Sequence, residues 1–372
     1  MKRILTIVGT RPEAIKLAPL TLEFARRTGE VEHILCSTAQ HRQMLDQVHA
    51  WFGIVPDIDL NLMAPNQKLA DFAAKALLEV TRVIEDVKPD VVLVQGDTTT
   101  AMMASLAAVM QKVDVGHVEA GLRTDNLYNP FPEELNRRVT GSVARFHFAP
   151  TARSAASLRA ENVPADWIFV TGNTVIDALR MTLERDVTLG LPFLETGRRV
   201  ILVTAHRRES FGAPFESLCR ALRSIADRNP DVELVYPVHL NPNVREPVGR
   251  LLTGHPRIHL IEPLSYEKFV HLMAAATLLL TDSGGVQEEA PYLGKPALVM
   301  RDNTERPEAV AAGTAKLVGT DETRIVAETE ILLRDERAYQ AMSRAGSPFG
   351  DGHSASRIAD ILLDQQCRPE TK

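Results

Sequence analysis

The chain has 372 residues, of which 45% are hydrophobic and 24% charged, and its formal net charge is −6. This length predicts two or three domains rather than one compact core, and the composition is that of a globular rather than a disordered protein. The acidic balance argues against broad binding to nucleic acid or to anionic membranes, which depends on an excess of Lys and Arg. A local basic pocket for phosphate is compatible with it.

The cysteine pattern and the hydropathy predict a cytoplasmic protein. Cys36, Cys219 and Cys367 lie far apart without zinc-binding spacing, so we expect reduced thiols and no metal site. The apolar run at the N-terminus is interrupted by Arg11 and Glu13 and lacks a cleavage-like site, which argues against a signal peptide. No apolar stretch approaches the roughly 18–20 residues that span a bilayer. We therefore expect a soluble protein without a membrane partner.

Short apolar runs followed by turn residues and then by helical periodicity recur along the first half of the chain. The predicted strands are residues 4–8, 33–37, 91–94, 116–118 and 146–149, and the predicted helices between them include 69–86 and 101–111. Strands that alternate with helices in this way predict a parallel sheet covered on both faces.

The same pattern begins again after Gly172. The predicted elements of this half are strands at 200–204, 233–237, 258–261, 278–281 and 297–299, a linker or surface loop at 188–199 and a last helix at 354–363. We therefore predict an α/β fold of two Rossmann-like, doubly wound domains that face each other across a cleft. The first spans 1–172 and is joined by the C-terminal helix at 352–372, and the second spans 173–351.

Ligands of open parallel sheets bind beyond the carboxyl ends of the strands, so polar residues at those positions are candidates for function. The first strand leads into Gly9, which permits a tight turn, and Pro12 suits the start of a helix. Arg11 and Lys16 would lie near the positive end of that helix, which suits an anionic ligand. The segment matches neither GxGxxG nor the Walker A pattern, and a plain strand–helix turn is an equally good interpretation.

Three acidic residues follow elements of the same predicted sheet. Asp97 comes directly after an apolar strand, Glu119 lies on a strand that should be buried on both faces, and Glu133 begins a helix. As single features, Asp97 could cap a helix and Glu119 could form a structural pair with Arg123. The helix macrodipole alone would explain Glu133. Taken together, the three carboxylates are candidates for acid–base chemistry.

In the second half, His206 follows the strand at 200–204 beside two arginines, where phosphate contact or proton transfer is a better interpretation than a structural histidine. The strongest phosphate signal is the Ser-Gly-Gly turn at 283–285, between a strand and a helix. Its backbone N–H groups and the helix dipole predict an anion site, and two adjacent glycines exceed what a helix cap requires. Glu289 could accept both hydroxyls of a ribose, and the polar loop that contains Arg306 should face the same rim.

These stretches are similar to those of the non-hydrolysing UDP-N-acetylglucosamine 2-epimerases. The matching motifs are GTRPEAIKLAPL from Gly9, TAQHRQML from Thr38, QGDTTT from Gln95, HVEAGLRT from His117, PFPEELNRR from Pro130, HRRES from His206 and DSGGVQEEAPYLGKPALVMRDNTERPEA from Asp282. Seven motifs in the same order, spread over nearly the whole chain, distinguish this family from most glycosyltransferases of the shared GT-B-type architecture. One small departure is Ala205, where a glycine is more usual.

The resemblance implies roles for the residues at these motif positions. Those implied to contact the UDP-sugar are Arg11, Lys16, Asp97, Glu119, Arg137, His206, Phe269, Ser283, Gly284, Gly285, Glu289 and Arg306, with Phe269 beside the uracil. Asp97, Glu119 and Glu133 would be the acid–base candidates. His206 would support the diphosphate or the leaving oxygen. An allosteric site for UDP-N-acetylglucosamine itself would involve Gln40, His41 and Gln43.

The implied reaction is reversible inversion at carbon 2 of UDP-N-acetylglucosamine, which gives UDP-N-acetylmannosamine. The family's route eliminates UDP with loss of the carbon-2 proton, leaving 2-acetamidoglucal, and adds UDP back with protonation from the opposite face. This route needs a base, an acid, a closed site and donors that stabilise the leaving diphosphate. It requires neither a redox cofactor nor a metal. A homodimer is the expected assembly.

Three other functions fit parts of the same pattern: a hydrolysing 2-epimerase that releases N-acetylmannosamine and UDP, a GT-B glycosyltransferase, and a nucleotide-sugar binding module. The TAQHR stretch from Thr38 favours the non-hydrolysing branch. A transferase has less use for three carboxylates in the donor cleft, and mere binding gives no reason to place acids beside the sugar.

Overall fold

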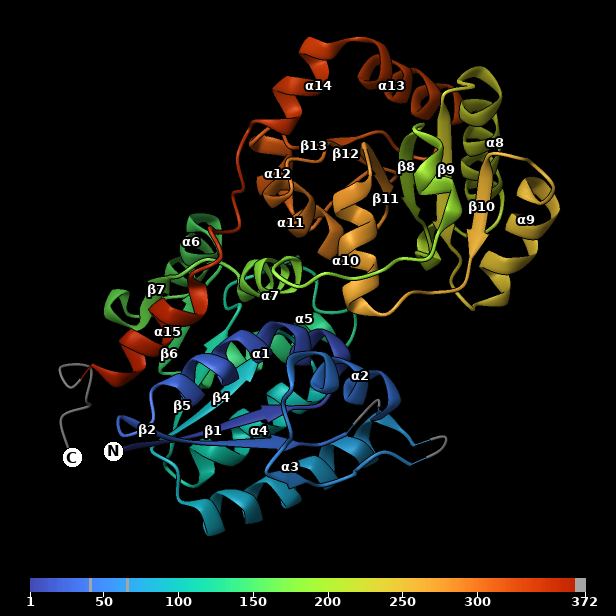
Figure 1. Ribbon diagram of the computed structural model, residues 1–372. Helices are drawn as coiled ribbons and strands as arrows, with labels where there is room; N and C mark the ends of the chain where they lie inside the picture. The colour runs from blue at the N-terminus through green and yellow to red at the C-terminus, as the bar shows by residue number, and fades with distance from the viewer. Residues whose placement is uncertain (40–41, 65–66, 365–372) are drawn as a thin grey trace. The chain divides into compact units, whose positions relative to one another are not determined.

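The computed structural model describes residues 1–39, 42–64 and 67–364, whose elements are drawn in Figure 1. The chain divides into two compact units. Unit 1 comprises Met1–Met181 and Phe349–Lys372, of which 365–372 are outside the described ranges, and unit 2 comprises Thr182–Pro348. The first boundary between the units falls within α7, after Met181. The repeating sequence pattern placed this boundary slightly earlier, after Gly172.

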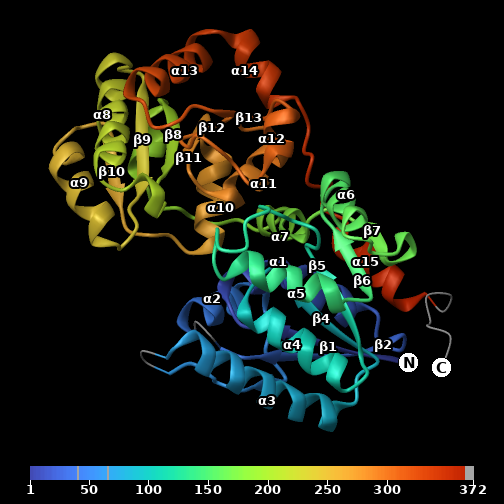
Figure 2. The same cartoon turned by 180° about the vertical axis from the view of Figure 1, so that it is seen from behind.

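Unit 1 is built on a seven-stranded sheet with the order β3-β2-β1-β4-β5-β6-β7, in which neighbouring strands are parallel. Its elements are β1 (Lys2–Val8), α1 (Arg11–Arg26), β2 (Val31–Ser37), α2 (Arg42–Phe52), β3 (Ile58–Asp59), α3 (Leu69–Val87), β4 (Val91–Gln95), α4 (Thr99–Met110), β5 (Asp114–Val118), α5 (Glu133–Val143), β6 (Phe146–Ala149), α6 (Ala152–Ala160), the 3-10 helix η1 (Ala165–Trp167), β7 (Ile168–Val170), α7 (Thr174–Leu183) and α15 (Ser354–Leu363). Helices lie on both faces of the sheet (Figures 1 and 2), which confirms the predicted doubly wound domain.

The alternation of side chains along the strands explains why both faces of this sheet are covered. Leu5 and Ile7 of β1 point into a core that they share with Val80 of α3 and with the alanines of α4. Val8 points to the opposite face and lines a small apolar cavity with Leu17 of α1. Strands buried on both faces are expected to be nearly continuous apolar runs, as these are.

The last helix, α15, packs on α1 and α7 of unit 1. The Asp177 carboxylate of α7 accepts hydrogen bonds from the backbone N–H groups of Ser354 (3.1 Å) and Ala355 (2.9 Å). These groups belong to the first turn of α15, where a helix leaves its N–H donors without partners of its own. Arg27, at the end of α1, forms an ion pair with Asp360 at 2.6 Å. Contacts at both ends therefore hold α15 against unit 1.

Unit 2 is built on a six-stranded sheet with the order β10-β9-β8-β11-β12-β13, again with parallel neighbours. Its elements are the 3-10 helix η2 (Pro192–Thr196), β8 (Arg199–Thr204), the 3-10 helix η3 (Arg208–Ser210), α8 (Ala213–Arg228), β9 (Val232–Pro237), α9 (Pro242–Leu252), β10 (Ile258–Ile261), α10 (Tyr266–Ala275), β11 (Leu278–Thr281), α11 (Gly284–Tyr292), β12 (Ala297–Val299), α12 (Pro307–Ala311), β13 (Ala315–Leu317), α13 (Glu322–Arg334) and α14 (Glu336–Ser343).

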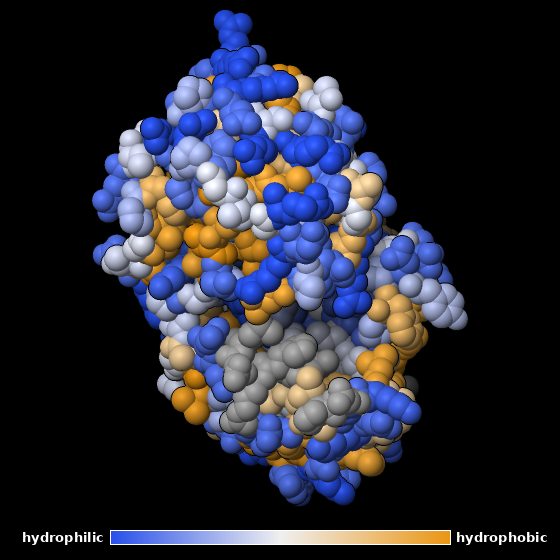
Figure 3. All heavy atoms as spheres, turned by 90° about the vertical axis from the view of Figure 1, so that its right-hand side faces the viewer, coloured by the Kyte–Doolittle hydropathy of each residue, from blue (hydrophilic) through white to orange (hydrophobic). Residues whose placement is uncertain are grey.

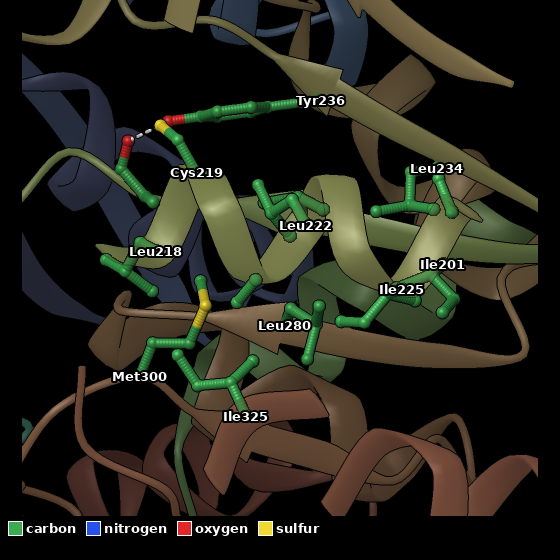
Figure 4. Packing of buried hydrophobic residues seen from close by; sticks show 14 of the residues in the cluster. Ile201, Leu218, Cys219, Leu222, Ile225, Leu234, Tyr236, Leu280, Met300 and Ile325 are labelled. Atoms are coloured by element: carbon green, nitrogen blue, oxygen red, sulfur yellow. Dashed lines mark hydrogen bonds between the residues drawn. The ribbon is translucent and has the colours of Figure 1, made fainter. Parts of the chain in front are cut away.

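The core of unit 2 fixes the backbone where β8 ends. Leu218 and Leu222 of α8 point toward the sheet, one turn apart, as Figure 4 shows. Beside them the buried Tyr236 donates a hydrogen bond from its hydroxyl group to the carbonyl of Ala205 at 2.5 Å. Because Ala205 directly precedes His206, this bond helps to hold the chain at a predicted site residue.

The ten predicted strands all coincide with observed ones, and the helix at 354–363 has the predicted bounds. Three strands were missed: β3, β7 and β13, with two or three residues each. All three lie at an edge of a sheet. A strand of two or three residues is too short to show the alternation of apolar and polar residues by which strands are recognised in a sequence. It forms because the neighbouring strand offers backbone hydrogen-bonding groups.

None of the helices in the described part of the chain combines the length and apolar character of a membrane span. The face drawn in Figure 3 carries mainly hydrophilic side chains with hydrophobic patches between them, which is ordinary for a folded domain.

Candidate functional site

Each sheet carries a group of polar side chains just beyond the carboxyl ends of its strands. In unit 1, we call Asp97, Glu119 and Glu133, with the cations Lys16 and Arg137, the carboxylate cluster. In unit 2, we call residues 283–285, with Arg207 and Arg306, the anion turn. The two groups belong to different units.

Glu119 is a buried carboxylate that has a cation partner from another element. Its Oε2 accepts hydrogen bonds from the ammonium group of Lys16, at 2.5 Å, and from the side-chain amide of Gln95. The side chains of Glu119 and Lys16 are only 4% and 14% exposed. The sequence suggested Arg123 as a structural partner, but Arg123 forms a two-point hydrogen bond with Glu161 at 2.6 and 2.7 Å. The cation comes instead from α1, far away in the chain.

The backbone after β5 is left-handed at two positions, which fixes where Glu119 points. Glu119 has a φ of +66°, a conformation that costs energy for any residue with a Cβ and that clusters at functional sites. Gly121 has a φ of +92°, and a Cβ there would lie 2.2 Å from the carbonyl oxygen of Ser154. The glycine of the HVEAGLRT motif is thus required both for its φ and for close packing on α6.

Asp97 forms the second ion pair of the carboxylate cluster. Its Oδ2 accepts a hydrogen bond from Nη2 of Arg137 at 2.6 Å, and its backbone carbonyl accepts one from the amide of Asn136 at 2.8 Å. A third of the Asp97 side chain is exposed, so a ligand can reach it. Thr98, not Asp97, caps α4 by accepting the N–H of Ala101 at 3.0 Å. The alternative role of Asp97 as a helix cap is therefore wrong.

Two adjacent acids at the start of α5 differ in their surroundings. Glu134 is fully buried and accepts hydrogen bonds from the N–H of Thr124 and from the guanidinium groups of Arg137 and Arg138, between 2.9 and 3.2 Å. Oε2 of Glu133 is also buried but has no hydrogen-bond partner among the residues that the structure describes. The Glu134 carboxylate thus has a structural role, whereas Glu133 has a carboxylate oxygen that could bind a ligand or a proton.

Arg11 and Gly9 form the turn between β1 and α1. Arg11 is the first residue of α1 and is partly buried. A Cβ on Gly9 would lie 2.4 Å from the hydroxyl oxygen of Thr100 and 2.6 Å from that of Thr38. Gly9 does not have a left-handed φ, so the glycine is needed for space between neighbouring strands rather than for the tight turn that we predicted from the sequence.

His117 is a buried core residue rather than a member of the cluster. It alternates with Glu119 along the chain, and its Nε2 lies 2.7 Å from the carbonyl oxygen of Gly96. Its neighbour across the sheet is His147, which is also buried. Burial lowers the pKa of His117 to about 3 and that of His147 to about 4, so both are neutral at pH 7.

These pKa values predict that unit 1 loses stability in mild acid. Between pH 6.5 and about 4, His117 and His147 are protonated in the unfolded chain but not in the folded chain. Each histidine therefore lowers the free energy of unfolding by about 1.4 kcal/mol for every pH unit by which the pH falls. Glu13 acts in the opposite direction between pH 7 and 4.5, because burial raises its pKa to about 7 and the folded chain then keeps a proton. Burial also lowers the pKa of His33 in unit 1 to about 4, so the three histidines outweigh Glu13 and the unfolding free energy should fall as the pH falls.

Urea denaturation at several pH values measures this dependence, and His117→Gln should make it shallower by about 1.4 kcal/mol per pH unit. An unchanged slope in that variant would contradict the assignment.

The anion turn opens α11 in unit 2. Ser283 is the N-cap residue of this helix but makes no side-chain cap bond, and Gly284 and Gly285 are its first residues. A Cβ on Gly284 would lie 3.9 Å from Nη2 of Arg207 and 3.9 Å from Cζ of Arg306. Two guanidinium groups therefore flank a helix N-terminus, whose first N–H groups have no partners within the helix, and this arrangement suits a phosphate group.

The loop after β12 is tied to α11. Nε of Arg306 donates to Glu288, and its Nη1 donates to the carbonyl of Glu305 at 3.2 Å. The Thr304 hydroxyl donates to the side-chain oxygen of Gln287 at 2.6 Å. These bonds hold the Arg306 guanidinium beside the turn. The two other predicted residues of this unit are the buried Glu289 on α11 and the half-buried Phe269 on α10.

His206 is held by a buried aspartate. Oδ2 of Asp282 accepts the backbone N–H groups of His206 (2.5 Å) and Arg207 (2.7 Å), and its Oδ1 lies 3.4 Å from Nδ1 of His206. The His206 ring stacks on that of His239, with centroids 5.3 Å apart. Burial lowers the pKa of His206 below its ordinary value, against the opposing effect of Asp282. Asp282, Arg207 and His239 were missed as site residues, although His239 follows β9 as His206 follows β8.

The structure does not describe the side chains of the predicted allosteric residues. Gln40 and His41 lie outside the described residues, and Gln43 falls in α2, where its side chain is outside them as well. Within residues 1–39, 42–64 and 67–364, no group of three or more His, Cys, Asp or Glu side chains is arranged to hold a metal ion.

The carboxylate cluster can exchange protons with a ligand, and the anion turn can bind a phosphate group. Residues 23–363 match the protein family described as UDP-N-acetylglucosamine 2-epimerase. The UDP-N-acetylglucosamine 2-epimerases of Salmonella typhimurium and Escherichia coli K12 are 56% and 55% identical to the chain over 97% and 98% of its length, and the matches cover 98% and 99% of those proteins.

A crystal structure of UDP-GlcNAc 2-epimerase from Neisseria meningitidis bound to UDP-GlcNAc is 49% identical, with a TM-score of 0.91 over 97% of this chain and 99% of that one. The two parallel sheets with their helices match this two-domain α/β fold, which is of the GT-B type. The chain therefore belongs to the UDP-N-acetylglucosamine 2-epimerase family, a family of enzymes that act on a nucleotide sugar.

Proposed function

We propose that this protein interconverts UDP-N-acetylglucosamine and UDP-N-acetylmannosamine by eliminating UDP and adding it back through 2-acetamidoglucal. The observation that carries the proposal is the carboxylate cluster, in which Asp97 and Glu119 each bind a cation and Glu133 keeps a buried oxygen without a partner. Inversion at carbon 2 needs one group to remove a proton and another to deliver one to the opposite face. Asp97 and Glu119, which follow the neighbouring strands β4 and β5, together with Glu133 at the start of α5, are the acids that would supply both.

The anion turn would bind the leaving diphosphate. The N–H groups at the start of α11 and the guanidinium groups of Arg207 and Arg306 are preorganised donors, which stabilise charge as it develops on the leaving oxygen. His206, whose pKa burial lowers against the opposing effect of Asp282, can take part in a hydrogen bond there. Glu289 would bind the ribose and Phe269 would contact the uracil. Hydride transfer has no part in this route.

Incubation with UDP-N-acetylglucosamine in deuterated water tests the proposal. NMR should detect UDP-N-acetylmannosamine with deuterium at carbon 2, because the proton that the base removes exchanges with solvent before re-addition. Free N-acetylmannosamine and UDP as the products would indicate the hydrolysing reaction instead. Absence of exchange without an added acceptor would indicate a transferase or a binding protein.

We also propose that the protein forms a homodimer. Leu78 of α3 and Met110 of α4 are 60% and 64% exposed, and Val109 beside them is 41% exposed. Helices α3 and α4 pack on each other, so these side chains belong to one helix pair. Exposed large apolar side chains on neighbouring helices are typical of a protein interface. Light scattering should give the mass of a dimer for the native chain and of a monomer for Leu78→Glu combined with Met110→Glu, and a native monomer would contradict the proposal.

Two further properties follow from the family resemblance. UDP-N-acetylglucosamine would also act as an activator through Gln40, His41 and Gln43, so that the reverse reaction from UDP-N-acetylmannosamine alone should begin with a lag that added UDP-N-acetylglucosamine removes. A linear start would contradict this. The protein would work in the cytoplasm, which is consistent with the unpaired buried cysteines Cys36 and Cys219.

A further inference from the structure

Glu13 is a buried carboxylate to which the proposed reaction gives no role. It is the third residue of α1 and is 1% exposed. Its Oε2 accepts the backbone N–H groups of Gly9 (3.1 Å) and Thr10 (2.7 Å), and its Oε1 accepts the hydroxyl group of Thr98 at 2.7 Å. A glutamate at this position of a capping box ordinarily accepts one N–H group at the protein surface. The two additional bonds and the burial need another explanation.

The bond to Thr98 connects two loops of the sheet. Gly9 and Thr10 follow β1, whereas Thr98 follows β4, the neighbour of β1. The Thr98 oxygen also accepts the N–H of Ala101 and so caps α4. Its single hydrogen is therefore directed to Glu13. One carboxylate thus joins the first turns of α1 and α4, whose N-termini both favour a negative charge.

Predicted site residues lie directly beside these two turns. Arg11 directly follows Thr10, and Asp97 directly precedes Thr98. The Glu13 carboxylate is the acceptor in its bonds with Gly9, Thr10 and Thr98, so its ionised form can accept all three at once. Burial raises the pKa of Glu13 to about 7, while the hydrogen bonds from Thr98, Thr10 and Gly9 act to lower it. These bonds therefore offset part of the cost of burying the charge.

We propose that Glu13 is a positioning residue that fixes Asp97 relative to Arg11 through its hydrogen bond with Thr98. The proposal rests on the function proposed above and deepens it. Asp97 can exchange a proton with carbon 2 only if its carboxylate is held within hydrogen-bond reach, and a displacement of about 1 Å can cost about 10²-fold in rate. The bond between Glu13 and Thr98 links the Asp97 turn directly to α1.

The test exchanges the two partners of this bond. Thr98→Asp keeps an acceptor for the N–H of Ala101 but places a second carboxylate against Glu13. Thr98→Ser keeps both the cap and the donor. The double variant Glu13→Gln with Thr98→Asp restores the bond with its polarity reversed, because the amide donates to the new carboxylate. Asp321→Ala, which removes the cap of α13 in unit 2, serves as the control for loss of a helix cap.

The kinetic constants of these variants are measured with UDP-N-acetylglucosamine at a temperature where circular dichroism shows that both units are folded. Thr98→Asp should lower kcat about 10²-fold with KM changed less than about threefold, since the acid–base group and not the diphosphate contact is displaced. Thr98→Ser and Asp321→Ala should retain kcat, and the double variant should regain most of it.

Two results would overturn the proposal. One is a kcat for Thr98→Asp within about threefold of that of the native chain. The other is a double variant that regains the unfolding midpoint but not kcat, since the bond would then serve stability alone. Absence of epimerisation by the native chain would instead refute the proposed function, so the two failures are distinguishable.

Discussion

Replacement of Asp97 by asparagine is expected to lower kcat by about 10²–10⁴-fold, which is the usual contribution of a general acid or base. The amide has the same size and its oxygen can still accept the hydrogen bond that Nη2 of Arg137 donates at 2.6 Å. It can no longer take up or release a proton. Because the diphosphate contacts that we propose for unit 2 are unchanged, KM should change far less than kcat. Steady-state rates followed by NMR separate the two constants.

Asp125→Asn provides a matched control for this variant. Asp125 lies in the same unit, its carboxylate forms an ion pair with Arg138 at 3.3 Å, and its side chain is 90% exposed. Its left-handed φ of +59° is one that asparagine adopts readily. The control should retain full activity. Near-native turnover of Asp97→Asn would remove Asp97 from the acid–base role.

Replacement of Lys16 by methionine is expected to lower the unfolding free energy of unit 1 by about 3–5 kcal/mol. Methionine fills much of the same space but leaves Glu119 buried without the ammonium group that lies 2.5 Å from its Oε2. The loss of the paired cation from a buried carboxylate has a cost of this order. The chain's two tryptophans, Trp51 and Trp167, both belong to unit 1, so their fluorescence reports on its unfolding in urea.

Two comparisons distinguish the buried pair from an ordinary surface pair. Lys16→Met with Glu119→Gln removes both charges and should regain most of the lost stability. Arg82→Met breaks an exposed ion pair with Glu79 on α3 and should cost less than about 1 kcal/mol. A loss in Lys16→Met no larger than that in Arg82→Met would contradict the assigned pairing, whatever its effect on activity.

Much of the fold could be predicted because the apolar composition of its strands shows that they are buried. The interior strands of a doubly wound sheet are buried on both faces, so they read as continuous apolar runs that end where the polar loop begins. The same feature located the carboxylate cluster and the anion turn, since polar residues directly after such runs lie at one edge of the sheet. The edge strand β13 has three residues and no such run, and it could not be found this way.

The partners of the site residues could not be predicted, for a related reason. Sequence proximity suggested Arg123 for Glu119, but the fold brings Lys16 of α1 to the residue that follows β5, and the partner is Lys16. Only the packing of distant elements decides such a pair. Glu13 left a local signal, the Thr-x-x-Glu spacing of a capping box, which predicts its bond to Thr10 but not its contact with α4.

We propose that the carboxylate cluster moves the carbon-2 proton while the anion turn binds UDP as a leaving group. Substrate labelled with oxygen-18 between carbon 1 and the β-phosphorus shows whether UDP leaves. If the bond from carbon 1 to oxygen breaks, rotation of the freed phosphate distributes the label, and recovered UDP-N-acetylglucosamine should carry it in non-bridging β-phosphate positions. Epimerisation that leaves all of the label in the bridging position would contradict the account.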